Sequence, residues 1–319
     1  MKLLITGFRG FVSPHFLNFL NEAEPGSEVL GIDRNSPSFD FSKYPNLRIS
    51  FRNTDLLNKE MVKEVLTDFK PEYILHLASV SSVAQSWQTP LDSFVNNTNI
   101  FLNLAEEVRE NHIACRILSV GSSDEYGEVA ENELPLTEDH PLKPLSPYAV
   151  ARVSQEMLSK MYAEGFGLDI IMTRSFNHIG PGQKDSFVVS SFAKQLVQLS
   201  QNPGAVKKIV VGDVSIIRDF LDVRDVVRAY YILLKKGKKA EVYNVCSGRG
   251  IMLKDIISKM STLLQLDIEI EKDPSRIRPN ENKKMQGSYD KLKTDLGWEP
   301  RIPFDTTLAD IIRYWQQAG

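Results

Sequence analysis

The chain has 319 residues, of which 42% are hydrophobic and 25% charged, and this composition is typical of a soluble globular protein with one large domain or two closely packed ones. Its formal net charge is −3 and no Lys/Arg block dominates, which argues against nucleic acid as a partner. No apolar stretch approaches the roughly 20 residues that span a bilayer, which argues against a membrane protein.

Short apolar runs alternate with helical patterns through the first half of the chain. The runs that predict strands are residues 2–6, 29–33, 73–77, 116–120 and 169–173. Each is almost continuously apolar, which indicates a strand buried on both faces, as in a parallel sheet. The helical patterns between them lie at residues 16–23, 59–69 and 101–110. This alternation predicts an α/β fold of the Rossmann type, with a doubly wound parallel sheet and right-handed crossovers.

The alternation loosens beyond about residue 175. We expect a dinucleotide-binding domain and a smaller α/β substrate-binding region, each made of two segments, because a helix at 226–234 and a strand at 242–246 are predicted to return to the main sheet. The expected division is 1–175 plus about 214–247 for the first, and about 176–213 plus 248–319 for the second.

The two cysteines, Cys115 and Cys246, lie singly in apolar runs. Such cysteines are more often buried packing residues than disulfide partners or ligands. We therefore expect free thiols, a cytoplasmic location and no metal site. The sequence opens on a strand-like run without a charged-then-apolar leader, so we expect no signal peptide.

A glycine-rich turn follows the first predicted strand. In T-G-F-R-G-F-V-S, Gly7 and Gly10 take the first two places of a G-x-x-G-x-x-G pattern, and Ser13 takes the third. The first glycine permits a tight turn and the second lets the backbone approach a pyrophosphate. Phe11 and Val12 then open a helix whose free N–H groups favour an anion.

The second predicted strand ends at Asp33, followed by Arg34. A carboxylate at this place can accept hydrogen bonds from an adenosine ribose, which favours NAD. A guanidinium beside it can hold a 2′-phosphate, which favours NADP. Both cofactors therefore remain open.

Two further motifs carry candidate chemistry. Ser122 follows a buried strand, at the sheet edge where α/β proteins bind ligands, and can donate to a carbonyl oxygen. Tyr148 and Arg152 are four residues apart, so on a helix they share one face. A neighbouring cation stabilises the phenolate, which suits a tyrosine to general-acid work. Arginine gives a permanent charge and a five-donor fork, which can also hold ribose hydroxyls.

The chain resembles the extended short-chain dehydrogenase/reductases that modify nucleotide sugars, over essentially its whole length. The matching motifs are T-G-x-x-G-F and the segments 53–57, 75–79, 122–127, 146–152 and 174–183. The segments 176–188, 216–226, 243–248 and 278–281 resemble the branch that reduces GDP-4-keto-6-deoxy-D-mannose. The resemblance implies an NAD(P)-dependent nucleotide-sugar oxidoreductase that makes GDP-D-rhamnose, in which Tyr148 protonates O4, Ser122 binds the developing oxyanion, and the chain forms a homodimer.

The resemblance also implies binding residues. Those expected at the NAD or NADP cofactor, besides Gly7, Gly10, Phe11, Val12, Asp33, Arg34, Tyr148 and Arg152, are Asp55, Leu56, Leu77, Ala78, Ser79, Asn97 and His178. Those expected at the GDP-sugar are Ser81, Asp124, Asn177, Lys194, Arg218, Arg278 and Glu281.

Several departures from the family pattern keep other readings open. Arg152 replaces the family lysine, Ser13 replaces the third glycine, and Ile100 and Phe101 stand where the family has Gly-Thr. Asp124 stands where related dehydratases carry a glutamate. The alternatives are a GDP-sugar dehydratase, epimerase or C4 oxidase with tightly bound NAD(P), and a sugar-nucleotide-binding protein without turnover.

Each motif also has an ordinary structural alternative. The glycine-rich turn could bind no cofactor, Asp33 could be a turn residue, and Ser122 could only cap a turn. Tyr148 and Arg152 could be a surface pair. The remaining alternatives are a loop histidine at 178, a salt bridge between Arg218 and Asp222, and a solvated charged loop at 276, 278 and 281.

Overall fold

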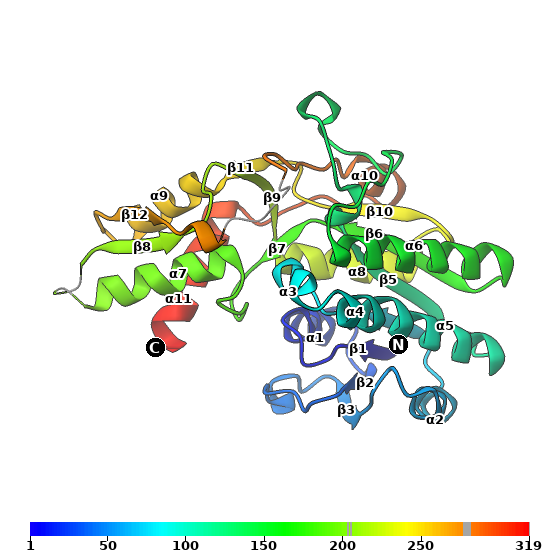
Figure 1. Ribbon diagram of the computed structural model, residues 1–319. Coiled ribbons are helices and arrows are strands. Elements are labelled where there is room, and N and C mark those ends of the chain that lie inside the picture. Colours follow the sequence, from blue (N-terminus) through cyan, green and yellow to red (C-terminus); the bar gives the residue numbers. More distant parts are fainter. Residues whose placement is uncertain (203, 205, 277–281, 319) are drawn as a thin grey trace.

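The computed structural model describes residues 1–202, 204, 206–276 and 282–318 (Figure 1). Its main sheet has seven strands in the order β10-β6-β5-β4-β1-β2-β3, and every neighbouring pair is parallel. The strands are β1 (Lys2–Thr6), β2 (Glu28–Asp33), β3 (Arg48–Asn53), β4 (Tyr73–His76), β5 (Arg116–Ser122), β6 (Asp169–Ser175) and β10 (Val242–Val245). The predicted doubly wound α/β fold is confirmed, as are the five predicted strands of the first half and the strand predicted at 242–246.

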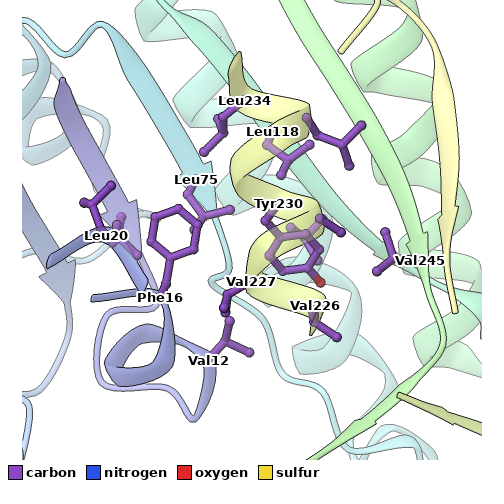
Figure 2. Close-up of a cluster of buried hydrophobic side chains, with 14 of the residues drawn as sticks. Val12, Phe16, Leu20, Leu75, Leu118, Val226, Val227, Tyr230, Leu234 and Val245 are labelled. Atoms are coloured by element: carbon purple, nitrogen blue, oxygen red, sulfur yellow. The ribbon is translucent and has the colours of Figure 1, made fainter. Parts of the chain in front are cut away.

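Helices cover both faces of this sheet. On one face lie α1 (Val12–Ala23) and α8 (Val223–Lys236), and on the other lie α2 (Lys59–Phe69), α5 (Ile100–Glu110) and α6 (Pro147–Gly165). Successive strand residues point to opposite faces, so Leu3 and Ile5 join the first core and Leu4 joins the second. Figure 2 shows the first core, where Phe16 of α1 and Tyr230 of α8 pack beside Leu75 and Leu118 of the sheet. Burial of these apolar side chains stabilises the packing of the helices on the main sheet.

The edge strand β3 was not predicted from the sequence. Its residues R-I-S-F-R-N alternate between polar and apolar, and none is fully buried. Ile49 and Phe51 pack against the first core. An edge strand with one solvated face lacks the continuous apolar run by which the other strands were identified.

A second group of elements lies to the left in Figure 1. It has a three-stranded sheet, β11-β9-β7, and a two-stranded sheet, β12-β8. Its elements are β7 (Asn177–Ile179), α7 (Val188–Gln201), β8 (Lys208–Val211), β9 (Ile217–Asp222), β11 (Gly250–Met252), α9 (Leu253–Leu263), β12 (Glu269–Lys272) and α11 (Phe304–Ala318). These helices and strands share a third core of their own. The division of the chain into two regions at the predicted boundaries stays a prediction.

The remaining helices are short. They are α3 (Val83–Gln88), α4 (Pro90–Phe94), a π-helical turn at Val95–Asn99 that leads into α5, and α10 (Asp290–Leu296). Within the described ranges, no helix combines the length and apolar character needed to cross a bilayer.

Candidate active site

A cavity of about 850 Å³ runs along the edge of the sheet where the parallel strands end. Its walls include the segments that follow β1, β2, β4, β5 and β6. Carboxyl ends of parallel strands are where open α/β sheets bind ligands. The predicted site residues that line it are Gly7, Gly10, Phe11, Val12, Asp33, Arg34, Asp55, Leu56, Leu77, Ala78, Ser79, Ser81, Ser122, Asp124, Tyr148, Arg152, Asn177 and His178.

The glycine-rich turn forms one end of the cavity. Gly7 has a φ of +67°, and a Cβ on it would lie 2.7 Å from the backbone N and Cα of Ala78. The N–H of Gly10 closes the turn by donating to the Gly7 carbonyl at 2.9 Å. A side chain at Gly7 would both strain the backbone and push away the segment after β4. The turn therefore requires glycine where the sequence analysis expected it.

Ser13 fills the place of the third glycine without reaching the cavity. Its side chain is buried, and its Oγ has no hydrogen-bond partner among the described residues. The expected extra side chain at the helix–sheet junction is therefore accommodated by burial of an unpaired hydroxyl. Burying such a group has a free-energy cost.

Asp33 lies at the end of β2, beside the glycine-rich turn. Its carboxylate accepts the N–H of Arg9 and the N–H of Asn35, each at 3.2 Å. The guanidinium of Arg34 donates to Asn96 Oδ1 at 3.4 Å. All five residues line the cavity, which thus offers both a carboxylate and a guanidinium at this end. Arg9 was not predicted, because the glycine pattern leaves that position unspecified.

Tyr148 and Arg152 form a buried pair on the first turns of α6. Ser146 caps the helix by accepting the N–H of Ala149 at 3.1 Å, which fixes where the helix begins. Tyr148 is 6% exposed and Arg152 is 5% exposed. The Nε–H of Arg152 donates to Tyr148 Oη at 3.2 Å. Because both side chains are buried, they are not a surface pair. The phenol oxygen accepts one hydrogen bond from the guanidinium, so the phenol can still donate its own hydrogen to another acceptor.

Ser122 is both a cap and a cavity residue. Its Oγ accepts the N–H of Asp124 at 3.2 Å and so caps a 3₁₀ turn at Ser123–Tyr126. Its side chain also lines the cavity with Tyr148. The hydroxyl hydrogen can therefore point at a bound oxygen while the oxygen serves the turn.

A buried carboxyl that the sequence analysis did not single out supports this turn. Glu125 is fully buried and its Oε1 accepts the N–H of Ser122 at 2.6 Å. Burial, and then the nearby carboxylate of Glu156, raise the pKa of Glu125 well above its ordinary value of 4.5. Glu156 is itself paired with Arg174 at 2.7 Å. Its surroundings therefore favour the protonated, neutral form of the Glu125 carboxyl.

We expect Glu125→Gln to show this protonation in stability measurements. A group whose pKa is raised by folding stabilises the protein fully below its unfolded pKa, near 4.5, and loses that contribution as pH rises through the folded value. An amide does not titrate. The thermal midpoint of the wild type should therefore fall relative to that of Glu125→Gln between pH 5 and pH 9, by about 2 °C or more. The exposed Glu64→Gln is the control, and a parallel pH dependence of all three proteins would contradict a raised pKa of Glu125.

Three predicted residues do not line the cavity. Asn97 is fully buried and ties down the segment after β4, because its side chain accepts the N–H of Val80 at 3.0 Å and donates to the Val80 carbonyl at 3.3 Å. Lys194 forms a 2.6 Å ion pair with Asp185. Arg218 donates to its neighbour's carbonyl, that of Ile217, at 2.9 Å.

The other predicted binding residues differ in how far the structure describes them. Arg278 and Glu281 lie outside the described residues. The ring of His178 lies parallel to that of Phe11, with centroids 6.1 Å apart. Burial lowers the pKa of His178, which keeps the ring neutral at pH 7.

Two cavity hydroxyls were missed by the sequence analysis. Ser175, at the end of β6, and Tyr230, on α8, lie 2.8 Å apart, oxygen to oxygen. Tyr230 is fully buried in the first core (Figure 2). Its helix could be predicted, but the direction of one aromatic side chain on that helix depends on packing that no local pattern records.

Comparisons with known proteins agree with this geometry. The profile of the GDP-mannose 4,6 dehydratase family matches residues 4–311. GDP-6-deoxy-D-mannose reductase of Pseudomonas aeruginosa is 33% identical over 315 residues, which cover 99% of this chain and 97% of that protein. GDP-mannose 4,6-dehydratase of Yersinia enterocolitica is 26% identical over 350 residues, covering 98% and 92%.

Solved structures are similar over the whole chain. The structure of RMD from Pseudomonas aeruginosa complexed with NADPH has a TM-score of 0.86 and 31% identity, covering 99% of this chain and 100% of that one. UDP-glucose 4-epimerase of Thermotoga maritima with UDP-glucose has a TM-score of 0.88 and 28% identity, covering 100% and 99%. With its cavity at the carboxyl ends of a Rossmann sheet and a family match across almost its full length, the chain belongs to the GDP-mannose 4,6-dehydratase family of the extended short-chain dehydrogenase/reductases.

Proposed function

We propose that the protein reduces the C4 keto group of GDP-4-keto-6-deoxy-D-mannose with NADPH or NADH to give GDP-D-rhamnose. The observation that carries the proposal is the buried Tyr148 phenol, held by Arg152 in the cavity that Ser122 also lines. The similarity to a GDP-6-deoxy-D-mannose reductase over 99% of the chain supports the same reaction. The function is that of an NAD(P)-dependent nucleotide-sugar oxidoreductase.

The residues at the glycine end fit a dinucleotide. Gly7 lets the turn pack closely against the segment after β4, since a Cβ at this position would overlap Ala78. Asp33 presents a carboxylate to a ribose, and Asp55 and Leu56 line the cavity beside it. We place Leu77, Ala78 and Ser79 along the dinucleotide, as the sequence analysis expected. When bound, a reduced nicotinamide supplies the hydride that C4 receives.

Proton transfer falls to this chain's own side chains. Tyr148 donates its hydroxyl hydrogen to O4 of the sugar while Arg152 stabilises the phenolate that remains. The Ser122 hydroxyl donates a hydrogen bond to the same oxygen as its charge develops. Both donors are preorganised, since Arg152 holds the phenol at 3.2 Å and Glu125 holds the Ser122 backbone at 2.6 Å.

We place the GDP-sugar in the part of the cavity nearest β7 and α7. Asn177 of β7 lines the cavity, as do Ser81 after β4 and Asp124 after β5. Arg218, Lys194, Arg278 and Glu281 are proposed on the resemblance alone. The boundaries proposed from the sequence assign the cofactor to the region containing the main sheet and the sugar nucleotide to the second region.

The direct test is turnover. Purified protein is incubated with GDP-4-keto-6-deoxy-D-mannose and each reduced cofactor, and the nicotinamide absorbance near ~340 nm is followed. We expect absorbance to fall with at least one cofactor and a C4-reduced product by NMR. Absence of turnover with both cofactors would overturn the proposal.

Asp124 lines the cavity at the place of the dehydratase glutamate, so the same NMR analysis with GDP-mannose and no added cofactor tests for dehydration.

Both cysteines are free thiols, which supports the proposed cytoplasmic location.

We further propose a homodimer through α3, α4 and α6. These neighbouring helices expose large apolar side chains on one side of the molecule. They are Trp87, Leu91, Phe94, Val150, Met157 and Met161. Positions 150, 157 and 161 share one face of α6, and an apolar surface of this kind is typical of an interface.

We expect Leu91→Asp combined with Met157→Asp to convert the dimer into a monomer. Leu91 is 74% exposed and Met157 is 62% exposed, so neither change disturbs the core, whereas two buried carboxylates on each side oppose association. Sedimentation velocity measures the outcome. Val206→Asp, at a position 79% exposed in the second group of elements, is the control and should remain dimeric. A monomeric wild type at micromolar concentration would refute the interface.

A further inference from the structure

Arg152 is held by more acceptors than Tyr148 alone. One Nη donates to the Val120 carbonyl at 3.1 Å and to Gln155 Oε1 at 2.6 Å. The other Nη donates to Ser79 Oγ at 2.5 Å. Four of the five guanidinium N–H groups therefore have acceptors that lie around its plane. An ammonium has only three donors and no plane to align.

Gln155, like the arginine it contacts, is buried and held by several hydrogen bonds. It is 1% exposed and lies one turn after Arg152 on α6. Its Nε2 donates to Ser119 Oγ at 2.9 Å and to the Val120 carbonyl at 3.4 Å. Ser119 in turn accepts from Ser159 Oγ at 2.9 Å. These bonds fix the amide so that its oxygen, the end that can accept, faces the guanidinium.

All of these acceptors are uncharged. In the described part of the chain, no carboxylate forms an ion pair with Arg152. The other titratable groups that face the pair are Tyr230 on α8 and His76 on β4. Burial, and then Arg152, lower the pKa of His76 to about 3, so this ring is neutral. Since its hydrogen-bond acceptors are uncharged, the positive charge of Arg152 is not offset by them and acts on Tyr148 and on the cavity.

We propose that Gln155 is a positioning residue for catalysis: its neutral amide oxygen orients the Arg152 guanidinium against Tyr148 without cancelling the charge that stabilises the phenolate. This inference rests on the proposed function, in which Tyr148 is the proton donor. It also explains how an arginine can work where the family has a lysine, since the extra donors of the fork are satisfied by Gln155 and its neighbours.

The first test is a double-mutant cycle. Gln155→Met removes the acceptor at similar volume, and we expect kcat to fall on the order of 10-fold with KM changed by less than about threefold. We expect Arg152→Lys to be slower than the wild type. When Gln155→Met is added to Arg152→Lys, kcat should fall by less than about threefold further, because the guanidinium N–H that donates to Gln155 is already absent. Gln195→Met is the matched control: this glutamine bridges the Val210 backbone in the second group of elements and should leave kcat unchanged.

The second test places a charge where the amide is. Gln155→Glu keeps the shape and the acceptor but pairs with Arg152. We expect kcat to fall about 10-fold and the alkaline limb of the kcat profile to move up by about one pH unit, because a phenol beside a neutralised cation gives up its proton at higher pH. Phenolate absorbance, taken as the difference between each protein and its Tyr148→Phe version, should move in the same direction.

The outcomes separate the two proposals. A wild type that reduces no GDP-4-keto sugar refutes the proposed function, and the phenolate titration still decides the role of Gln155 without any substrate. Equal losses for Gln155→Met in both backgrounds would make Gln155 merely structural. Phenolate titrations that coincide for the wild type and Gln155→Glu would overturn the inference.

Discussion

Replacing Tyr148 by phenylalanine is expected to lower kcat on the order of 10²–10⁴-fold, the usual contribution of general-acid catalysis. The ring is 94% buried within α6 and the sheet edge, so phenylalanine keeps the packing and removes only the hydroxyl. The loss should appear in kcat and in kcat/KM alike, since the proton moves only in the transition state. Fluorescence titration of NADPH should show an affinity within a few-fold of the wild type.

Tyr162→Phe is the matched control on the same helix. Tyr162 is also buried, but its hydroxyl donates to Glu106 of α5 at 2.5 Å, and neither of these residues lines the cavity. Because neither side chain reaches the cavity, its loss should reduce stability and leave kcat unchanged. If Tyr148→Phe retained activity within threefold of the wild type, the proton donor would have to be sought elsewhere in the cavity. If the wild type bound GDP-sugar and NADPH without turnover, the non-catalytic alternative would hold.

The main sheet could be predicted because parallel strands buried on both faces leave near-continuous apolar runs. Gly7, Asp33 and Ser122 each follow or end one of these strands, so the sequence alone predicts that they lie on one edge of the sheet. The pair of Tyr148 and Arg152 was predictable for a similar reason, because helical geometry brings positions four apart together. β3 was missed, since its solvated face interrupts the apolar pattern.

The polar groups that support the site could not be predicted. Gln155 contacts Arg152 through helix spacing, but its importance depends on the Val120 carbonyl and on Ser119, which approach only when β5 packs against α6. Glu125 reads from the sequence as one more charged turn residue. Only its complete burial beside Ser122 reveals that its pKa is raised. Lys194 was assigned to the substrate by resemblance, whereas its position depends on Asp185, nine residues earlier, in a turn.

Gly7→Ala is expected to weaken NADPH binding on the order of 100-fold or more. The added Cβ would lie 2.7 Å from two backbone atoms of Ala78, so the turn and the segment after β4 must separate. Both segments line the cavity where the dinucleotide is proposed to lie. Displaced backbone N–H groups no longer meet the pyrophosphate, and a steric shift at this place also moves Ser79 away from Arg152. Isothermal titration calorimetry with NADPH measures the loss.

The positive φ alone is not expected to cause it. Gly26 has a φ of +84° with no atom within 4 Å of an added Cβ, so Gly26→Ala isolates the backbone strain. That change should lower the free energy of unfolding by about 1 kcal/mol and leave NADPH affinity unaltered. Gly7→Ala carries the same strain plus the overlap with Ala78, and only the overlap reaches the cavity. Equal NADPH affinities for the two variants would mean that the glycine-rich turn does not hold the cofactor, and the dinucleotide would then need another place along the sheet edge.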